Sequence, residues 1–440
     1  MIQFRFDPNR KVTVADQARV RKYFFLHMRP NRLPVSTLRY THTFGLGGMS
    51  AVLVILLILT GAMMMLAYEP TPERAHDSIL GLQTETLFGP LIRSLHYWSA
   101  NLLITVALLH LLRVFFTGAK DGPRKLNWVI GLVLLACVLA SNFTGYLLPW
   151  DQLSYWAVTI CTGMLGYVPG VGGWLQEAAR GGSDVGPTTL IIFYTLHTTV
   201  VPVVLAVLMG FHFWRVRKAR GVVVPRQAGE PAPVDPEFAR GWPDLILREL
   251  VVGTVLVAVV MMLAIFFAPE LGIPANPGMS PNPAKAPWYF VGFQELQIHF
   301  HPVFSILVIP LVAVAGLIWW PYRRREVDQT GVLFGSPTGR STAGIAAVLG
   351  LVVTPLLIVA DEMWLQTTAW APSVISHGLL PCLILAAAVV GFRLVLRKQM
   401  KATREDADQA AFVLMGVAFA VLTITGVWFR GAGMALVWPW

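Results

Sequence analysis

The sequence predicts an all-α integral membrane protein, and three observations support this fold class. Of its 440 residues, 55% are hydrophobic and only 13% are charged, a balance that is too apolar for a soluble globular domain. Several apolar runs approach the roughly 20 residues that a helix needs to cross a bilayer. The basic residues, which give the chain a formal net charge of +10, lie mainly between these runs.

Nine apolar runs are candidate transmembrane helices. They cover residues 46–67, 92–117, 126–148, 190–214, 247–268, 303–321, 343–361, 374–396 and 411–429. We therefore expect a four-helix bundle followed by further C-terminal transmembrane helices, about nine in total. An odd number of crossings puts the two ends of the chain on opposite sides of the membrane.

The charged residues assign a side to each connecting segment. Basic residues precede the first run and recur in alternate loops, at Arg5, Arg10, Lys11, Arg19, Arg21, Lys22, Arg29, Arg32, Arg39, Lys120, Arg124, Lys125, Arg215, Arg217, Lys218, Arg220, Arg323, Arg324, Arg325, Arg397, Lys398, Lys401 and Arg404. Acidic residues lie in the other loops, at Glu69, Glu73, Asp77, Asp151, Glu177, Asp184, Asp361 and Glu362. Basic loops stay in the cytoplasm, so we predict a cytoplasmic N-terminus in a bacterial inner membrane, with Trp440 outside. Because the basic residues are divided among loops, no nucleic-acid partner is expected.

A stretch rich in Pro, Gly and charged residues marks the domain boundary. We expect an N-terminal four-helix domain at 1–220, a cytoplasmic linker at 221–246 and a C-terminal domain at 247–440. Two loops on the opposite side, 149–189 and 269–302, are long and rich in aromatic residues. Loops of that length usually carry function or form a lid.

Four histidines lie inside the second and fourth apolar runs, where an imidazole is costly unless it is hydrogen-bonded or coordinated. His96 and His110 are 14 residues apart, and His197 and His212 are 15 apart. These separations return each pair to one face of its helix, within about 40° and 60° respectively. Since both helices run in the same direction, His96 faces His197 near the outer surface and His110 faces His212 near the inner one.

Facing imidazoles suit a six-coordinate haem iron, which has no open position for oxygen and serves electron transfer. Two glycine pairs on the neighbouring helices repeat with the same 14-residue period and leave room for a macrocycle: Gly47, Gly61, Gly131 and Gly145. The sequence therefore predicts two bis-histidine haems at two depths. The alternative, four histidines that only bond to neighbouring helices, does not account for the matching glycines.

With these residues in place, the chain resembles the cytochrome b family, the membrane core of the quinol:cytochrome c oxidoreductases. The resemblance is carried by "RSLHYWSANLL", "LPWDQLSYWA" and "FYTLHTTVVP" in the first four helices. The 15-residue interval and "LPWDQLSYWA" are closest to the chloroplast-type (bf) branch. The linker lies where that branch is divided into two polypeptides, so the chain resembles a fusion with a subunit IV-like C-terminal part.

The resemblance implies two b haems, the outer one held by His96 and His197 and the inner one by His110 and His212. It also implies that Arg93 and Arg124 lie beside haem propionates. Arg217, with Lys218, would bind a quinone near the inner surface; the alternative is a basic anchor at the membrane surface. The family position of a covalent haem c attachment is Gly45 here, so no covalent haem c is expected.

The outer quinol site departs from the family. Its Pro-Glu-Trp-Tyr motif is replaced by Ala-Pro-Trp-Tyr at 286–289, so the usual glutamate is missing. Glu295 is the nearest carboxylate further along, and an apolar pocket would raise its pKa into a useful range; the alternative is a loop glutamate facing solvent. The candidate catalytic residues are Pro287, Trp288, Tyr289, Tyr155 and Glu295.

By the same resemblance, quinol is oxidised at the outer face. One electron goes to a Rieske iron–sulfur protein and the other crosses the two haems to an inner quinone, with proton translocation. The implied partners are the Rieske protein, a cytochrome c that could carry several haems, the quinone pool, the lipid membrane and a second copy in a homodimeric multisubunit complex.

Two other functions stay open at this point. A di-haem membrane anchor could pass electrons between quinone and another partner without bifurcation. A transporter could use the histidines as a proton relay, but that class predicts broken helices and an internal repeat. The last helices give no sign of chemistry, so we expect them to serve packing or partner docking, with Arg430 at the membrane interface.

Overall fold

The computed structural model describes residues 32–231, 237–365 and 371–438. Within these ranges, nine helices are long and apolar enough to cross a membrane, which confirms the predicted fold class. The basic residues from Arg5 to Arg29, part of the linker and Trp440 lie outside the described residues.

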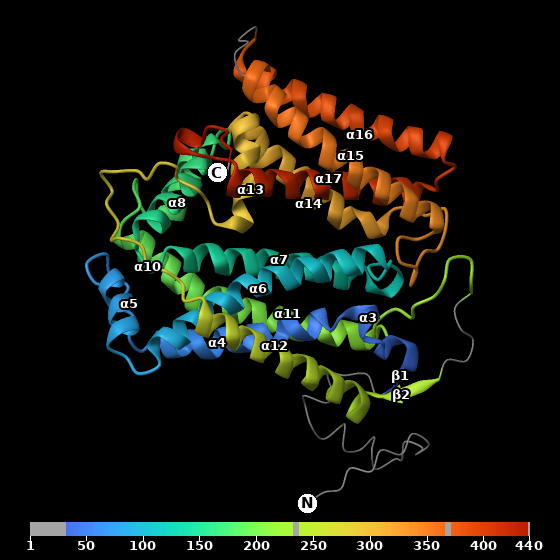
Figure 1. Ribbon diagram of the computed structural model, residues 1–440, viewed down its shortest axis with the longest axis horizontal. Coiled ribbons are helices and arrows are strands. Elements are labelled where there is room, and N and C mark those ends of the chain that lie inside the picture. Colours follow the sequence, from blue (N-terminus) through green and yellow to red (C-terminus); the bar gives the residue numbers. More distant parts are fainter. Residues whose placement is uncertain (1–31, 232–236, 366–370, 439–440) are drawn as a thin grey trace, which may run out of the picture.

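The first four crossings form a bundle, seen in the middle of Figure 1. They are α4 (Leu46–Met64), α6 (Gly89–Phe116), α7 (Lys125–Tyr146) and a long helix that begins as α10 (Pro187–Thr195) and continues as α11 (Val201–Lys218). The remaining five are α12 (Ile246–Phe266), α14 (Ile309–Trp319), α15 (Pro337–Ala360), α16 (Leu380–Gln399) and α17 (Arg404–Trp428).

The two long loops contain helices of their own. The first holds α8 (Gln152–Gly163) and α9 (Gly172–Arg180), and the second holds α13 (Trp288–His299). Asp151 begins α8 by accepting a hydrogen bond from the Ser154 amide at 2.9 Å, which satisfies a free N–H of the first turn. Together with α5 (Ala75–Thr84), these short helices lie at one end of the bundle (Figure 1).

At the other end, a small ribbon joins the two halves of the chain. β1 (Arg32–Pro34) pairs antiparallel with β2 (Phe238–Arg240), beside α3 (Tyr40–Thr43). Arg248 at the start of α12 also donates to the Leu38 carbonyl at 2.6 Å. The segment before the first crossing is therefore attached to the segment before the fifth.

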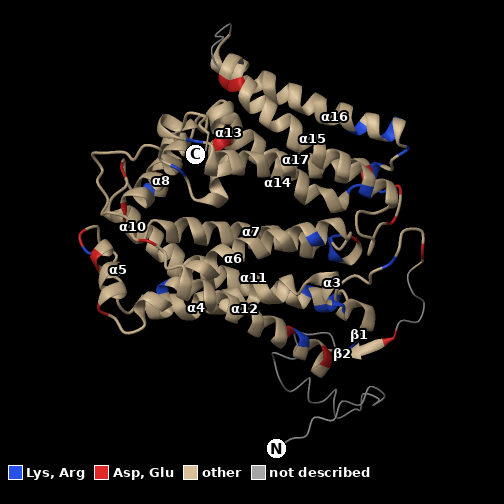
Figure 2. Ribbon diagram, viewed as in Figure 1, with Lys and Arg blue, Asp and Glu red and all other residues tan. Residues whose placement is uncertain are grey.

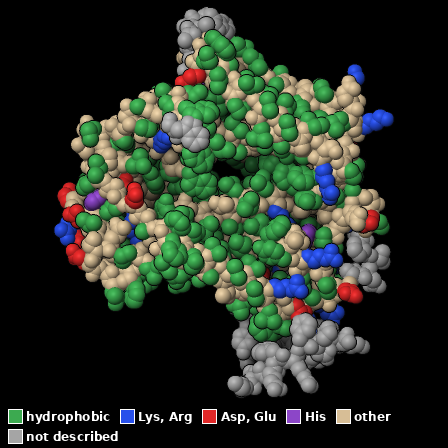
Figure 3. Space-filling model, viewed as in Figure 1, with side chains coloured by type: hydrophobic (Ala, Val, Ile, Leu, Met, Phe, Trp, Pro, Cys, Tyr) green, Lys and Arg blue, Asp and Glu red, His purple; other side chains and the backbone are tan. Residues whose placement is uncertain are grey.

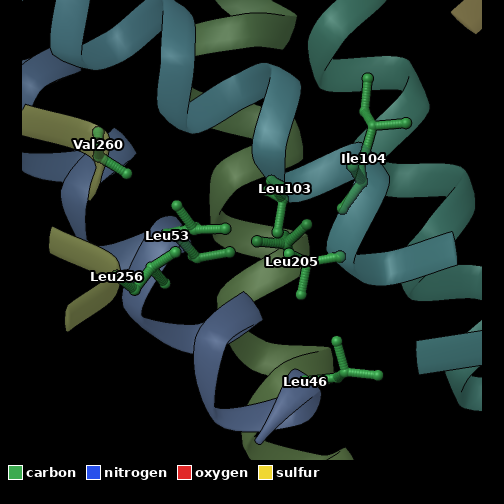
Figure 4. Close-up of a cluster of buried hydrophobic side chains, with 10 residues drawn as sticks. Leu46, Leu53, Leu103, Ile104, Leu205, Leu256 and Val260 are labelled. Carbon is green, nitrogen blue, oxygen red and sulfur yellow. The ribbon is translucent and has the colours of Figure 1, made fainter. Parts of the chain in front are cut away.

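The hydrophobic core of the bundle extends beyond the predicted four-helix domain. Leu53 of α4, Leu103 of α6 and Leu205 of α11 pack with Leu256 and Val260 of α12 (Figure 4). Thus α12 follows the linker in sequence but shares the core of the N-terminal helices. These aliphatic side chains fill the space between the four helices at the close density typical of protein interiors.

Charge and apolar surface are separated along the bundle axis. Lys and Arg gather at the end with α3 and the ribbon, whereas Asp and Glu surround α5 and α8 at the opposite end (Figure 2). Between these ends the surface is largely hydrophobic (Figure 3). This is the distribution of a multi-pass membrane protein.

Candidate functional site

The four histidines meet in two facing pairs, as the spacing predicts. The ring centroids of His96 and His197 lie 6.1 Å apart, and those of His110 and His212 lie 6.5 Å apart. Metal–imidazole bonds of about 2.0 Å put the centroids of two axial imidazoles roughly 6 Å apart. Both pairs therefore have the separation that one iron between them requires.

The 15-residue interval in the fourth crossing has a structural cause. A single wide π-type turn, Leu196–Val200, contains His197 and precedes Pro202, which has no amide hydrogen to donate to the preceding turn. A π-bulge adds one residue to a helix without changing the face that follows. The 15 residues between His197 and His212 are thus equivalent to the 14 between His96 and His110.

Each predicted glycine lies against one histidine. A Cβ atom added to Gly47 would lie 3.4 Å from His110, one on Gly61 3.2 Å from His96, and one on Gly131 3.6 Å from His212. At Gly145 the added atom would overlap the ring of His197. The glycines give each imidazole the space beside the neighbouring helix.

Hydrogen bonds orient the outer pair. His197 Nδ1 donates to the Ser141 carbonyl at 2.9 Å. The Thr60 hydroxyl donates to Leu56, and its oxygen lies 2.9 Å from His96 Nδ1 and accepts from it. With both Nδ1 atoms bonded, each Nε2 lone pair is left for a metal, the usual arrangement of a ligating histidine.

The predicted propionate arginines lie at opposite ends of the bundle. Arg93 donates to the carbonyls of Pro269 and Glu270 at 2.6 and 3.1 Å. Arg124 donates to two carbonyls after α11, while its buried Nε lacks a partner among the described residues. The buried Nε of Arg215 also lacks a hydrogen-bond partner among the described residues. Buried cationic donors at the same end of the bundle as the inner histidine pair fit an anionic propionate.

A mostly apolar cavity lies at the end with the acidic loops. It is partly open to the surface of the protein. Its walls come from α7, α8 and α13, with Phe143, Tyr146, Ile160, Cys161, Met164, Tyr289, Phe290, Phe293, Gln294 and Gln297 among them. Gly145, which faces His197, lies between the cavity residues Phe143 and Tyr146 along α7, so the cavity and the outer histidine pair lie at the same level on different faces of this helix.

Only part of the predicted catalytic set lines this cavity. Pro287 and Tyr289 do, and burial raises the pKa of the Tyr289 phenol, which keeps it protonated. Trp288 instead donates to the Asn101 side chain at 2.7 Å. Tyr155 is buried, and its hydroxyl donates to Val185; neither side chain is in the lining.

The structure corrects the prediction for Glu295. Its side chain is fully buried, so it does not face solvent, but it lies on the face of α13 opposite the cavity. Burial would raise its pKa, yet hydrogen bonds from His299 and Arg430 hold that pKa below its ordinary value. Arg430 is not interfacial, since it is buried against Glu295. Sequence reasoning missed this pair, because its members are 135 residues apart.

Gln294 is a cavity residue that the sequence did not single out. Its side-chain oxygen accepts from the Ala286 amide at 2.8 Å, and its nitrogen donates to the Ala284 carbonyl at 2.7 Å. These bonds hold the segment before α13 in place, including the position where the family glutamate is missing. The segment before α13 is thus fixed by a side chain that lies eight and ten residues further along the chain.

Comparison with known proteins identifies the family. The Cytochrome b/b6/petB family matches residues 32–220. Cytochrome b6 of Chlamydomonas reinhardtii is 44% identical over 173 residues, which cover 39% of this chain and 80% of the relative. Cytochrome b6 of Prochlorococcus marinus strain MIT 9211 is 46% identical over 173 residues, covering 39% and 79%. The chain belongs to the cytochrome b/b6 family.

This membership makes the chain the cytochrome b subunit of a bc-type quinol oxidoreductase complex, with b haems as the family's cofactors. The transporter alternative is therefore wrong. A solved structure titled "Hyperthermophilic respiratory Complex III" aligns with a TM-score of 0.65 and 21% identity, covering 94% of this chain and 98% of that chain. The shared fold thus includes the C-terminal helices, where the sequence offers little resemblance.

Proposed function

We propose that the chain oxidises quinol in the cavity between α7, α8 and α13. One electron goes to a Rieske iron–sulfur protein and the other to a quinone at the basic end, coupled to proton translocation. The observation that carries this proposal is the position of Gly145, between two cavity residues on one side and His197 on the other.

Four histidines would hold the two haems: His96 with His197, and His110 with His212. When bound, these haems would supply one-electron transfer between the two ends of the bundle. The side chains do the positioning: Ser141 and Thr60 orient the outer imidazoles, and Arg124 and Arg215 present buried donors at the inner level. No covalent haem c is proposed, because Gly45 occupies the attachment position.

The cavity would bind quinol by excluding water and bonding its hydroxyls. Among the described lining residues, the polar groups are the phenols of Tyr146 and Tyr289, the Cys161 thiol, and the amides of Gln294 and Gln297. None is a carboxylate or an imidazole. Because burial raises the Tyr289 pKa, this phenol acts as a hydrogen-bonding group and not as a base, so the proton acceptor comes from the partner protein or from water.

Arg217 is the proposed contact for the inner quinone. It lies in the last turn of α11, five residues beyond His212 and at the basic end. A guanidinium there could bond a reduced quinone oxygen, although a surface anchor role explains the same position. The other proposed partners are a cytochrome c and a second copy of the complex in a homodimer. The proposed location is a bacterial inner membrane, with the basic end in the cytoplasm.

The experiment is quinol oxidation by the purified complex with and without its iron–sulfur protein. We expect two b-type components in the reduced-minus-oxidised spectrum and turnover that stops when the iron–sulfur protein is removed. Full turnover without that protein would favour the second candidate, a di-haem anchor that does not bifurcate electrons; the missing family glutamate at 286–289 is the observation that keeps it in view.

A further inference from the structure

Five charged side chains form a cluster on the face of α13 that points away from the cavity. We call Glu295, His299, Asp361, Glu362 and Arg430 the outer ionic cluster. Glu295 and His299 belong to α13, the two other acids follow α15, and Arg430 follows α17. Three elements distant in sequence therefore meet at one buried charged site.

Arg430 is the centre of this cluster. Its side chain is 0% exposed, as is that of Glu295. Its Nε lies 3.0 and 3.1 Å from the two Glu295 oxygens, and its Nη2 donates to Oε1 at 2.7 Å. Its Nη1 donates to Glu362 at 3.0 Å and to the Met434 carbonyl at 2.9 Å. A guanidinium fork bound in this way fixes direction as well as distance.

His299 extends the cluster to α15. Its Nε2 lies 3.2 Å from Glu295 and its Nδ1 lies 2.6 Å from Asp361. Burial alone would lower the pKa of His299, but the bonds to these two carboxylates outweigh it and raise the pKa to about 9. A protonated His299 donates from both nitrogens and bridges the two acids.

Close backbone packing supports the same contact between α13 and α17. A Cβ atom on Gly426 would lie 2.9 Å from Val291, and one on Gly292 would overlap Thr423. Before α13, Lys285 donates to the Val427 carbonyl at 2.9 Å. At its other end, α17 is anchored by Asp408, which pairs with Arg323 and Arg393. The helix that holds α13 is thus itself fixed at both ends.

The two faces of α13 have different tasks. Phe290, Phe293, Gln294 and Gln297 line the cavity at helical spacings of three and four residues, and Glu295 lies on the opposite face. We propose that Arg430 is a positioning residue for quinol oxidation: by holding Glu295, it fixes the rotation and depth of the helix that forms one cavity wall. This inference rests on the proposed function of the cavity, and it gives the segment that follows the last described transmembrane helix a role in positioning one wall of the quinol site.

The test uses the purified complex with Arg430→Met, Arg430→Lys and Glu295→Gln. We expect Arg430→Met to raise the KM for quinol and to lower kcat/KM by roughly 10- to 100-fold, because small displacements of positioning groups have such effects. Arg430→Lys should be intermediate, since an ammonium cannot reproduce the fork. The spectra of both haems should be unchanged, because the printed bonds of the cluster involve none of the four proposed haem ligands.

Arg404→Met is the matched control. Arg404 begins the same helix and pairs with Glu326 at the opposite end, where the two side chains are 47% and 38% exposed. It should leave KM and kcat unaltered. A purely structural role for Arg430 predicts a lower melting temperature with an unchanged KM, and that result would overturn the inference.

Glu295→Gln covers the case in which Arg430→Met does not assemble. The amide keeps the side-chain shape and can still accept a bond from Arg430, so the protein should fold, and its KM should rise by a smaller factor. A wild-type KM in this variant would also reject the inference. If the wild-type complex itself fails to oxidise quinol, the proposed function fails instead, and the two outcomes are distinguished in one assay.

Discussion

The two halves of the chain build their buried polar sites in different ways. In the N-terminal half, His96 and His110 repeat along one helix, and the glycines that face them repeat with the same period on another. In the C-terminal half, the partners of Glu295 and His299 lie 135 and 62 residues away. A site whose residues repeat with the period of a helix can be found from the sequence. A site whose residues are brought together by tertiary packing leaves no such local pattern.

The largest expected effect is the loss of a haem ligand in the periodic half. His197→Leu should remove the outer b-type component from the spectrum, retain the inner one and reduce quinol oxidation to background, because one imidazole is left without its opposite ligand. His212→Leu should remove the inner component instead.

His377→Leu is the control for these two variants. His377 lies in the turn before α16, far along the chain from both pairs, and its Nδ1 contacts the Ser376 hydroxyl at 2.8 Å. Both spectral components should persist in this variant. If they also persisted in His197→Leu, the bis-histidine assignment would be rejected.

The second prediction concerns the energy of the long-range site. Glu295→Met alone breaks the buried Arg430–Glu295 pair and leaves the guanidinium with only Glu362 and the Met434 carbonyl as partners; breaking a buried pair in this way costs about 3–5 kcal/mol. The double variant with Arg430→Met removes both charges and should recover most of this loss, although Glu362 then loses a partner. Thermal unfolding of the detergent-solubilised complex measures both. Additive losses in the double variant would show that the two residues are not coupled.

This contrast also explains what the sequence could and could not predict. Hydropathy marked each of the nine crossings found in the described part of the chain, because bilayer thickness sets the length of each run. The facing of His96 with His197 followed from helix geometry together with the shared direction of the two crossings, which the loop charges gave. The wide turn at Leu196–Val200 was not predicted. The 15-residue interval between His197 and His212 shows that one residue is added, but not where or by what structure.

The apolar cavity beside α13 was only partly accessible to sequence reasoning. Pro287 and Tyr289 were found through a family motif, whereas the lining residues of α7 and α8 were not singled out. Glu295 was chosen because it is near the motif in sequence, yet one further step of about 100° along α13 turned it from the cavity toward α17. Arg430 looked like a surface residue because nothing nearby in the sequence revealed its partner.

The third prediction tests whether the glycines spaced 14 residues apart in the N-terminal half make room for the histidines. Gly145→Ala puts a Cβ atom into the His197 ring, and overpacking of this kind typically costs about 1–3 kcal/mol. We expect a lower haem-to-protein ratio for the outer component and a lower melting temperature.

Gly48→Ala is the matched substitution, because an added Cβ there meets nothing within 4 Å. It lies beside Gly47 in α4 and should be neutral, or stabilising by up to about 1 kcal/mol, since alanine favours a helix over glycine. Equal effects of the two substitutions would mean that the 14-residue period does not reflect the histidines.

The smallest expected effect is a pH dependence that belongs to the C-terminal half. Metal-ligating histidines are neutral, whereas His299, facing Glu295 and Asp361 with Arg430 beyond them, is held protonated with a pKa raised from 6.5 to about 9. A raised pKa contributes stability that is complete below about pH 6.5 and is lost as the pH rises through about 9, at most about 1.4 kcal/mol per pH unit. The melting temperature of the wild-type complex should therefore fall between pH 7 and 9.5 more steeply than that of His299→Gln, which cannot titrate. Identical slopes would show that the pKa of His299 is not raised in the folded protein, which would contradict a protonated bridge between Glu295 and Asp361.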